Sequence, residues 1–189
     1  MRYKVPAVVG VMAVIGSFGT LAVAQAAQSH AKADSAHHAA ARVRACRPQL
    51  LRLRNGSAVP EATGQETRIF VLRNNSSHRC GLDGYPVVAL IARHGRVLPF
   101  RYRDRGDQML TSATPHLVVL VPGGRAFFGI NKNVCVSRST ATARSLTAWP
   151  LGQLTVRLRR TLDYCGPHDP GHRVDVSPFE KTLDAVLAH

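Results

Sequence analysis

Apolar and polar residues alternate in short stretches along most of this chain. Residues 51–54 (Leu-Arg-Leu-Arg) show the period-two pattern of a strand with one face buried. Residues 67–73 (Thr-Arg-Ile-Phe-Val-Leu-Arg) form a run rich in β-branched and aromatic side chains, and the turn cluster at 74–77 ends it. We therefore expect a strand over each of these two segments.

Further apolar runs separated by turn residues follow toward the C-terminus. His94-Gly95 and Pro122-Gly123-Gly124 predict tight reversals, so that the strands around His94-Gly95 form a meander. Counted together, about eight short strands predict an all-β fold, an antiparallel β-sandwich rather than a barrel. The remaining strands are expected over residues 85–92, 96–102, 116–121, 125–130, 154–158 and 173–177.

The N-terminal segment has the pattern of a secretory signal peptide. Residues 1–4 carry two positive charges, residues 5–24 are largely apolar, and Ala24-Gln25-Ala26 provides the small residues of a cleavage site. We expect residues 1–26 to be removed on export. A retained transmembrane anchor is the alternative, since about 20 apolar residues can span a bilayer, but several glycines lower the hydrophobicity of this run.

The chain after the leader is long enough for one domain with a sizeable core. Residues 27–45 are rich in alanine and lack a sustained apolar stripe, so we interpret them as a flexible linker. A metal site at the three histidines of this segment is the alternative, although no carboxylate framework accompanies them. We assign residues 46–180 to the β-sandwich and residues 181–189 to a tail, with a short helix possible over residues 179–187.

The chain is strongly basic, with a formal net charge of +14 that falls to +12 when Arg2 and Lys4 leave with the leader. The positive residues are spread over many segments, including 93–105 and 157–160, and we interpret them as solvated strand faces rather than one patch. A basic exported protein attracts anionic wall polymers and acidic lipids. No nucleic-acid partner is expected, because aromatic residues are few and no recognition motif is present.

Four cysteines, Cys46, Cys80, Cys135 and Cys165, allow three disulfide connectivities. The sequence does not choose among them, but pairing Cys46 with Cys80 and Cys135 with Cys165 keeps each bond local. A redox or metal site needs closer spacing, such as Cys-x-x-Cys, and none occurs. Two structural disulfides are therefore expected, as is usual in an exported domain. No cysteine precedes Cys46, so the modified cysteine of a lipoprotein is missing.

No catalytic motif is visible in the chain. A Gly-x-Ser-x-Gly elbow, a His-Glu-x-x-His helix and a phosphate-binding glycine loop are all missing. We therefore expect no enzymatic activity, no cofactor and no metal, with a hydrolase whose site is dispersed over distant strands as the alternative. The arrangement most similar to a metal-binding site is His168-Asp169, which lies beside Cys165 and near His172 in the sequence. The loose candidates are His78, His94, His116, His168 and His172.

Three residues are candidates for contact with a ligand at the surface: Asp83, Tyr85 and Trp149. Asp83 and Tyr85 belong to a turn after Cys80 in which two glycines, Gly81 and Gly84, accept backbone angles that other residues resist. An aromatic ring and a carboxylate at a loop tip suit a sugar or a peptide. Trp149 precedes a strand in a loop, where its first interpretation is a residue that fills the core, with contact to a ligand as the alternative.

Several of these segments follow one another in the order found in a known family. They are Leu72-Arg73-Asn74-Asn75-Ser76-Ser77, Cys80-Gly81-Leu82-Asp83-Gly84-Tyr85-Pro86, Val121-Pro122-Gly123-Gly124, Cys135, Cys165 and Val176-Ser177-Pro178-Phe179. From Cys46 to Phe179 the chain resembles the actinobacterial exported domain of unknown function 4232. The resemblance implies a secreted or envelope-associated, immunoglobulin-like β domain. It implies no activity and no site residues.

We therefore expect a secreted or cell-wall-associated, non-catalytic β-sandwich without a membrane span after cleavage of its leader. The expected partner is an anionic cell-wall polymer or an envelope protein. A protein-interaction domain that uses an exposed sheet edge is a further alternative.

Overall fold

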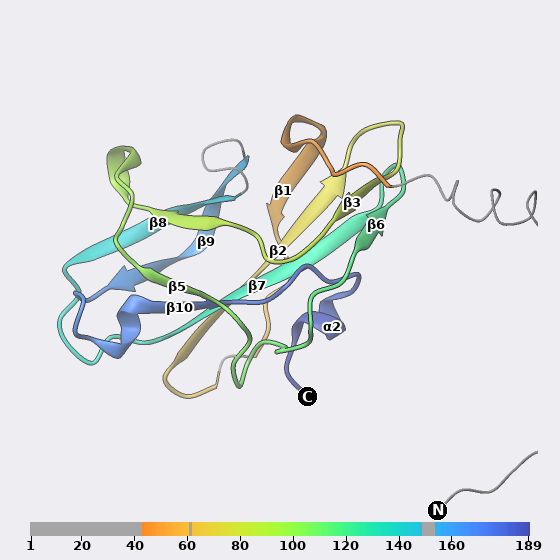
Figure 1. Ribbon diagram of the computed structural model, residues 1–189. Helices are drawn as coiled ribbons and strands as arrows, with labels where there is room; N and C mark the ends of the chain where they lie inside the picture. The colour runs from red at the N-terminus through yellow and green to blue at the C-terminus, as the bar shows by residue number, and fades with distance from the viewer. Residues whose placement is uncertain (1–42, 61, 149–153) are drawn as a thin grey trace, which may run out of the picture. The chain divides into compact units, whose positions relative to one another are not determined.

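The computed structural model describes residues 43–60, 62–148 and 154–189. These residues form a nearly all-β domain with ten strands, where about eight were expected (Figure 1). The strands are β1 (Leu51–Asn55), β2 (Gln65–Asn74), β3 (Cys80–Leu82), β4 (Val88–Ile91), β5 (Arg101–Asp104), β6 (Val118–Leu120), β7 (Arg125–Asn133), β8 (Ala141–Ala148), β9 (Leu154–Tyr164) and β10 (Arg173–Val176). One short α-helix, α2 (Leu183–Val186), follows the last strand, and the single-turn 3-10 helices are Pro48–Leu50, Arg93–Gly95 and Pro170–His172.

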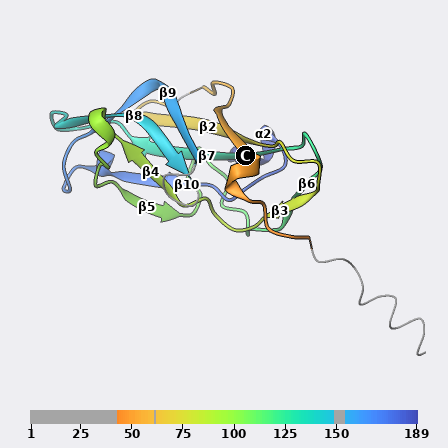
Figure 2. The same ribbon diagram turned by 90° about the horizontal axis from the view of Figure 1, so that it is seen from above.

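The strands belong to three sheets. The largest has five strands in the order β1-β2-β7-β10-β5, a second has β4-β8-β9, and β3 pairs with β6 alone. Figure 2 shows β4, β8 and β9 as neighbours. All named pairs are antiparallel except β5 with β10, which is parallel. The expectation of a purely antiparallel arrangement is therefore wrong at this edge of the large sheet.

The five-stranded and three-stranded sheets share one hydrophobic core. The period-two alternation directs Leu51, Leu53, Phe70 and Leu72 into this core, as expected for strands with one buried face. The ring of Phe70 stacks on Phe128 with a centroid distance of 5.1 Å. The three-stranded sheet supplies apolar side chains that are fully buried, namely Leu90, Leu146 and Leu162.

The hairpin expected around His94-Gly95 forms only beside its turn, and the longer meander is wrong. His94 and Gly95 have positive φ angles. The returning segment makes one bridge, between Ile91 and Val97, with hydrogen bonds from the N–H of Ala92 to the carbonyl of Arg96 and from the N–H of Leu98 to the carbonyl of Leu90. Pro99 follows and has no N–H to continue the ladder. The chain then crosses to the five-stranded sheet, where β5 pairs with β10.

The unit around Pro122-Gly123-Gly124 also differs from a simple hairpin. Gly123 has a φ of 73°, as the turn requires. The strands on either side, however, join different sheets, since β6 pairs with β3 and β7 pairs with β2 and β10. The turn therefore marks a change of sheet.

The expected disulfide pairing is confirmed. Cys46 is bonded to Cys80 and Cys135 to Cys165, with Cα–Cα distances of 4.8 and 5.7 Å. The first bond lies beside an isolated bridge between Ala45 and Gly81, so it holds the segment before β1 against β3. Two disulfides are consistent with an extracellular protein.

The outer face of the five-stranded sheet, which points away from the shared core, is covered at one end by the C-terminal segment. Leu110 and Val186 are fully buried against Ile69 in a second, smaller apolar cluster. Gly129 permits this contact, because a Cβ there would lie 2.5 Å from Cδ2 of Leu110. Residues 181–189 thus pack against the domain, with α2 shorter than the helix suggested for residues 179–187. Within the described residues, no helix has the length and apolar character that a membrane crossing requires.

Candidate functional site: an arginine groove

Three arginines lie side by side on the outer face of the five-stranded sheet. Arg52 on β1 is paired in register with Arg73 on β2, and Arg73 is paired with Arg125 on β7. Residues directly opposite in neighbouring strands point to the same face, and adjacent strands lie about 4.8 Å apart. Arg52, Arg73 and Arg125, which we call the arginine row, therefore project from positions within about 10 Å of one another.

The buried face of the same strands fixes the arginine row in place. Arg52 lies between Leu51 and Leu53, which are 6% and 7% exposed, and Arg73 follows Leu72, which is 1% exposed. A shift of one residue in the pairing would turn these leucines toward solvent and the arginines into the core. The hydrophobic pattern thus sets the register that brings the row together.

A groove runs beside the arginine row. It has a volume of about 310 Å³ and no acidic side chain in its lining. Val71 and Phe127, a pair in register on the two central strands, are half-buried between the charged positions and supply its apolar surface. The lining consists of Arg52, Arg54, Asn55, Gly56, Ser57, Val71, Arg73, Arg125, Phe127 and Arg159, and we call it the arginine groove.

The fifth arginine of the groove comes from the other large sheet. Arg159 on β9 donates a hydrogen bond from Nη1 to the carbonyl oxygen of Gly56, at 3.2 Å. Two residues earlier, the carbonyl oxygen of Arg157 accepts a hydrogen bond of 2.8 Å from Nδ2 of Asn55. These contacts hold β9 against the end of β1. They place the positively charged side chain of Arg159 at the groove.

The charge of the arginine row has no acidic partner in the part of the chain that the structure describes. No ion pair forms there at Arg52, Arg73 or Arg125, and all three are exposed. Three arginines elsewhere do have a carboxylate nearby: Arg68 lies 3.7 Å from Glu66, and Asp175 receives both Arg103 and Arg105. Like charges directly opposite in a sheet are destabilising. The groove is therefore a site of uncompensated positive potential.

The arginines do lie on exposed strand faces, as expected, and the structure adds that three of them are neighbours in one sheet. Sequence reasoning missed the row because its three members belong to segments that are far apart in the chain. Each member sits beside apolar residues in a period-two pattern, which predicts that it points outward, but the pattern does not say which strands are neighbours.

Asp83 and Tyr85 lie in the loop after β3, outside the lining of the arginine groove. Asp83 is exposed, and its Oδ1 accepts a hydrogen bond of 2.9 Å from the N–H of Gly84. Gly84 has a φ of 76°, so the expected turn chemistry is confirmed there. The same reasoning is wrong for Gly81, a buried strand residue whose Cβ would lie 2.7 Å from Cδ1 of Leu117. Trp149 lies outside the described residues.

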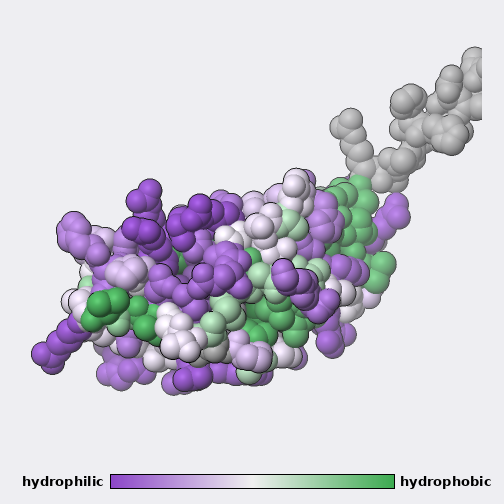
Figure 3. All heavy atoms as spheres, turned by 90° about the horizontal axis from the view of Figure 1, so that it is seen from below, coloured by the Kyte–Doolittle hydropathy of each residue, from purple (hydrophilic) through white to green (hydrophobic). Residues whose placement is uncertain are grey.

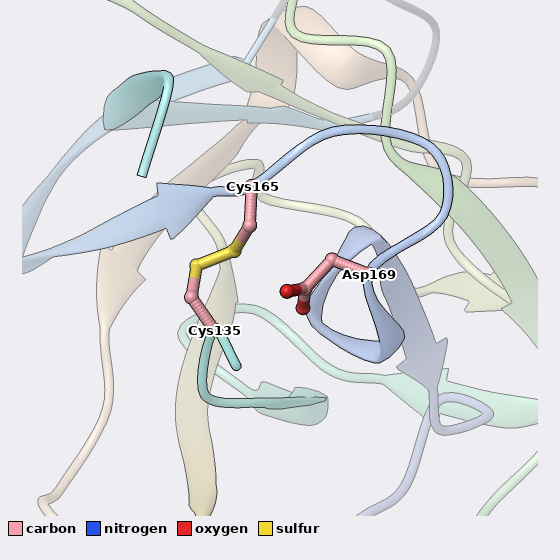
Figure 4. A group of neighbouring side chains, drawn as sticks. All are labelled: Cys135, Cys165 and Asp169. Atoms are coloured by element: carbon pink, nitrogen blue, oxygen red, sulfur yellow. A yellow bond between two sulfur atoms is a disulfide. The ribbon is translucent and has the colours of Figure 1, made fainter. Parts of the chain in front are cut away.

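The group most like a metal site is Cys135, Cys165 and Asp169, whose ligand atoms lie within 4.8 Å of one another (Figure 4). The two sulfurs are joined in a disulfide, so neither is a free thiolate. Asp169 accepts hydrogen bonds from the Ser137 hydroxyl, at 2.6 Å, and from the N–H groups of Ser137 and Gly171. These bonds, that of the hydroxyl first, lower the pKa of Asp169 to about 2. The hydrogen bonds of Asp169 therefore stabilise the conformation of the loops around the second disulfide.

The histidines singled out in the sequence are dispersed over the domain. The His116 ring lies 3.8 Å from the carboxylate of Glu180. Burial raises the pKa of this glutamate, and His116 partly offsets that rise. His78 contacts Ser77 at 3.0 Å, without a carboxylate on the ring among the described residues. His168 lines a shallow pocket at the second disulfide.

Together the sheets, the two disulfides and the groove define a disulfide-bonded, nearly all-β domain with an open basic groove on one sheet. Residues 46–180 match the family model of the Domain of unknown function (DUF4232), and the chain belongs to this family. No curated protein and no solved structure matches the chain significantly.

Proposed function

We propose that this chain is an exported, non-catalytic, immunoglobulin-like β-sandwich that binds anionic polymers of the cell envelope through the arginine groove. One observation carries the proposal: the arginine row is exposed, in register and without acidic partners among the described residues. The leader pattern over residues 1–26 supports export. The shared core of two sheets supports a sandwich.

The kind of positive charge also favours anion binding. Of the 25 basic residues in the chain, 21 are arginine and four are lysine. A guanidinium presents a planar fork of donors that matches an oxyanion and stays charged at all physiological pH values. A surface that needed only solubility would work equally well with lysine.

The proposal is tested with isolated cell walls. The protein is purified from the producing culture in its naturally processed form. It is incubated with cell walls at a series of salt concentrations, the walls are sedimented, and the fraction of protein bound to them is measured. We expect binding at low salt that decreases as salt screens the charges. Protein that stays in the supernatant at every salt concentration would refute the proposal.

A protein partner is the second candidate, because apolar side chains are exposed on either side of β6. Leu117 is 49% exposed and Val121 is 56% exposed. The face shown in Figure 3 is mostly hydrophilic, with apolar side chains gathered in separate patches. Crosslinking to one defined neighbour, with little dependence on salt, would favour this candidate over polymer binding.

A further inference from the structure

We infer that the arginine groove binds a phosphodiester-linked polyol chain, with successive phosphates held by arginines of β1, β2 and β7. This inference rests on the proposed function and adds the ligand class and the direction in which the ligand lies. The row Arg52, Arg73, Arg125 runs across the strands, so the polymer crosses the strands as well.

Charge complementarity favours a ligand with closely spaced single charges. Positions in the arginine row are about 4.8 Å apart from one strand to the next. Arg54 and Arg159 add positive charge at the β1 end of the groove. A phosphodiester carries one permanent negative charge per unit, and its oxygens accept the paired N–H donors of a guanidinium.

The size and surface of the groove favour a thin chain. The groove has a volume of about 310 Å³, which gives room for a single thin chain, whereas a flat bilayer cannot enter it. Val71 and Phe127 give it an apolar surface between the charged positions, which suits the uncharged carbon units between phosphates. Single-stranded nucleic acid is less suited, since its bases bind chiefly by stacking on several exposed aromatic rings, whereas the lining contains one aromatic residue, Phe127.

The inference is tested by removing three charges from the groove and three from elsewhere. The groove variant is Arg52→Gln/Arg73→Gln/Arg125→Gln. The matched control is Arg101→Gln/Arg144→Gln/Arg173→Gln, which removes the same charge from exposed positions on β5, β8 and β10. Binding of poly(glycerol phosphate) is measured by titration calorimetry at low salt, with thermal unfolding run on each variant to confirm folding.

We expect the groove variant to lose about tenfold or more in affinity and the control to lose about threefold or less, because only the first removes direct phosphate contacts. Equal losses in the two variants would overturn the inference and leave a diffuse field as the cause of binding. Wall binding by the wild-type protein is measured separately: if it persists, binding to envelope polymers stands, while its placement in the arginine groove fails together with the inference. If the wild type binds no walls at any salt concentration, the proposed function itself fails.

Two further measurements test the ligand class and the binding mode. Tighter binding of a carboxylate polymer or of a single-stranded oligonucleotide than of poly(glycerol phosphate) would overturn the assignment. The variant Arg52→Lys/Arg73→Lys/Arg125→Lys keeps the charge and loses the fork, and we expect it to bind about three- to tenfold more weakly than wild type. Wild-type affinity in this variant would refute guanidinium recognition.

Discussion

Arg73 lies between two like charges, with Arg52 on one side and Arg125 on the other. Replacing it by threonine removes both repulsions and adds a β-branched residue that suits a strand. We expect Arg73→Thr to raise the stability by about 0.5–1 kcal/mol, which corresponds to roughly 1–4 °C in Tm for a domain of this size.

Thermal unfolding at low and high salt measures this effect. The gain should shrink as salt is added, because repulsion between exposed charges is screened. Arg144→Thr is the control, since Arg144 is an exposed arginine at the irregular point of the β8–β9 pairing and has no partner in the register. An equal gain in this control would show that repulsion within the row is not the cause.

Asp169 gives the stability a pH dependence in acid. Hydrogen bonds from Ser137 and from loop N–H groups lower its pKa from 3.8 to about 2 in the folded protein. A carboxyl with a lowered folded pKa stabilises the fold above its unfolded pKa, and this contribution is lost as pH falls through about 4 to 2. We expect wild type to lose more stability over this range than Asp169→Asn does.

Urea unfolding between pH 2 and pH 5 provides the comparison. Other carboxylates titrate in the same range, so the difference between wild type and variant is the quantity to follow. Asp104→Asn is the matched control, because Asp104 is exposed. If Asp169→Asn and Asp104→Asn change the acid profile equally, the hydrogen bonds at Asp169 do not set it.

Asp107 joins the loop after β5 to a buried amide. Its Oδ2 accepts a hydrogen bond of 2.6 Å from Nδ2 of Asn131, and its Oδ1 accepts the N–H groups of Met109 and Leu110. Asp107→Ala leaves the buried Asn131 amide with one partner fewer, so we expect a loss of about 2 kcal/mol. Asp107→Asn keeps an acceptor oxygen and should cost less. Denaturant midpoints measure both, and a neutral Asp107→Ala would contradict this role.

At the scale of elements, strands with strong alternation were predictable and others were not. The strands β1, β2 and β9 contain the patterned segments 51–54, 67–73 and 154–158. In contrast, β8 consists mostly of small and polar residues (Ala-Thr-Ala-Arg-Ser-Leu-Thr-Ala). It becomes a strand because β4 and β9 pair with it on both sides. Tertiary pairing of this kind overrides a weak local pattern.

β3 was missed for a different reason. Its three residues, Cys80–Leu82, are all buried, but glycine beside cysteine in a short segment indicates a turn. Gly81 is there because Leu117 of the neighbouring segment packs against its Cα. Such a close approach leaves no periodic pattern in the sequence.

The Cys46–Cys80 disulfide acts on the elements that it encloses. It closes a loop with a sequence separation of 34, which contains β1 and β2. Replacing both cysteines by alanine should lower the free energy of unfolding by about 3 kcal/mol, because the unfolded chain gains freedom. Urea midpoints of Cys46→Ala/Cys80→Ala and of the oxidised wild type measure the loss. Equal midpoints would show that the bond contributes no stability.

At the scale of the whole molecule, the sequence gives the amount of charge and the structure gives its position. Residues 52, 73 and 125 meet because β2 lies between β1 and β7 in the sheet. That strand order depends on long-range pairing, which no local pattern encodes. The disulfide pairing was easier to predict from the sequence, because pairing each cysteine with its neighbour along the chain gives the two observed bonds.

The first disulfide also decides how the domain carries mechanical load. A force applied on the N-terminal side of Cys46 passes through the disulfide to Cys80, because this covalent bond bypasses the residues between the two cysteines. Both β1 and β2 lie within this bypassed loop. Tension along the chain therefore bypasses the segments that carry Arg52 and Arg73, so the pairing of these two arginines is not stretched directly while the domain is pulled.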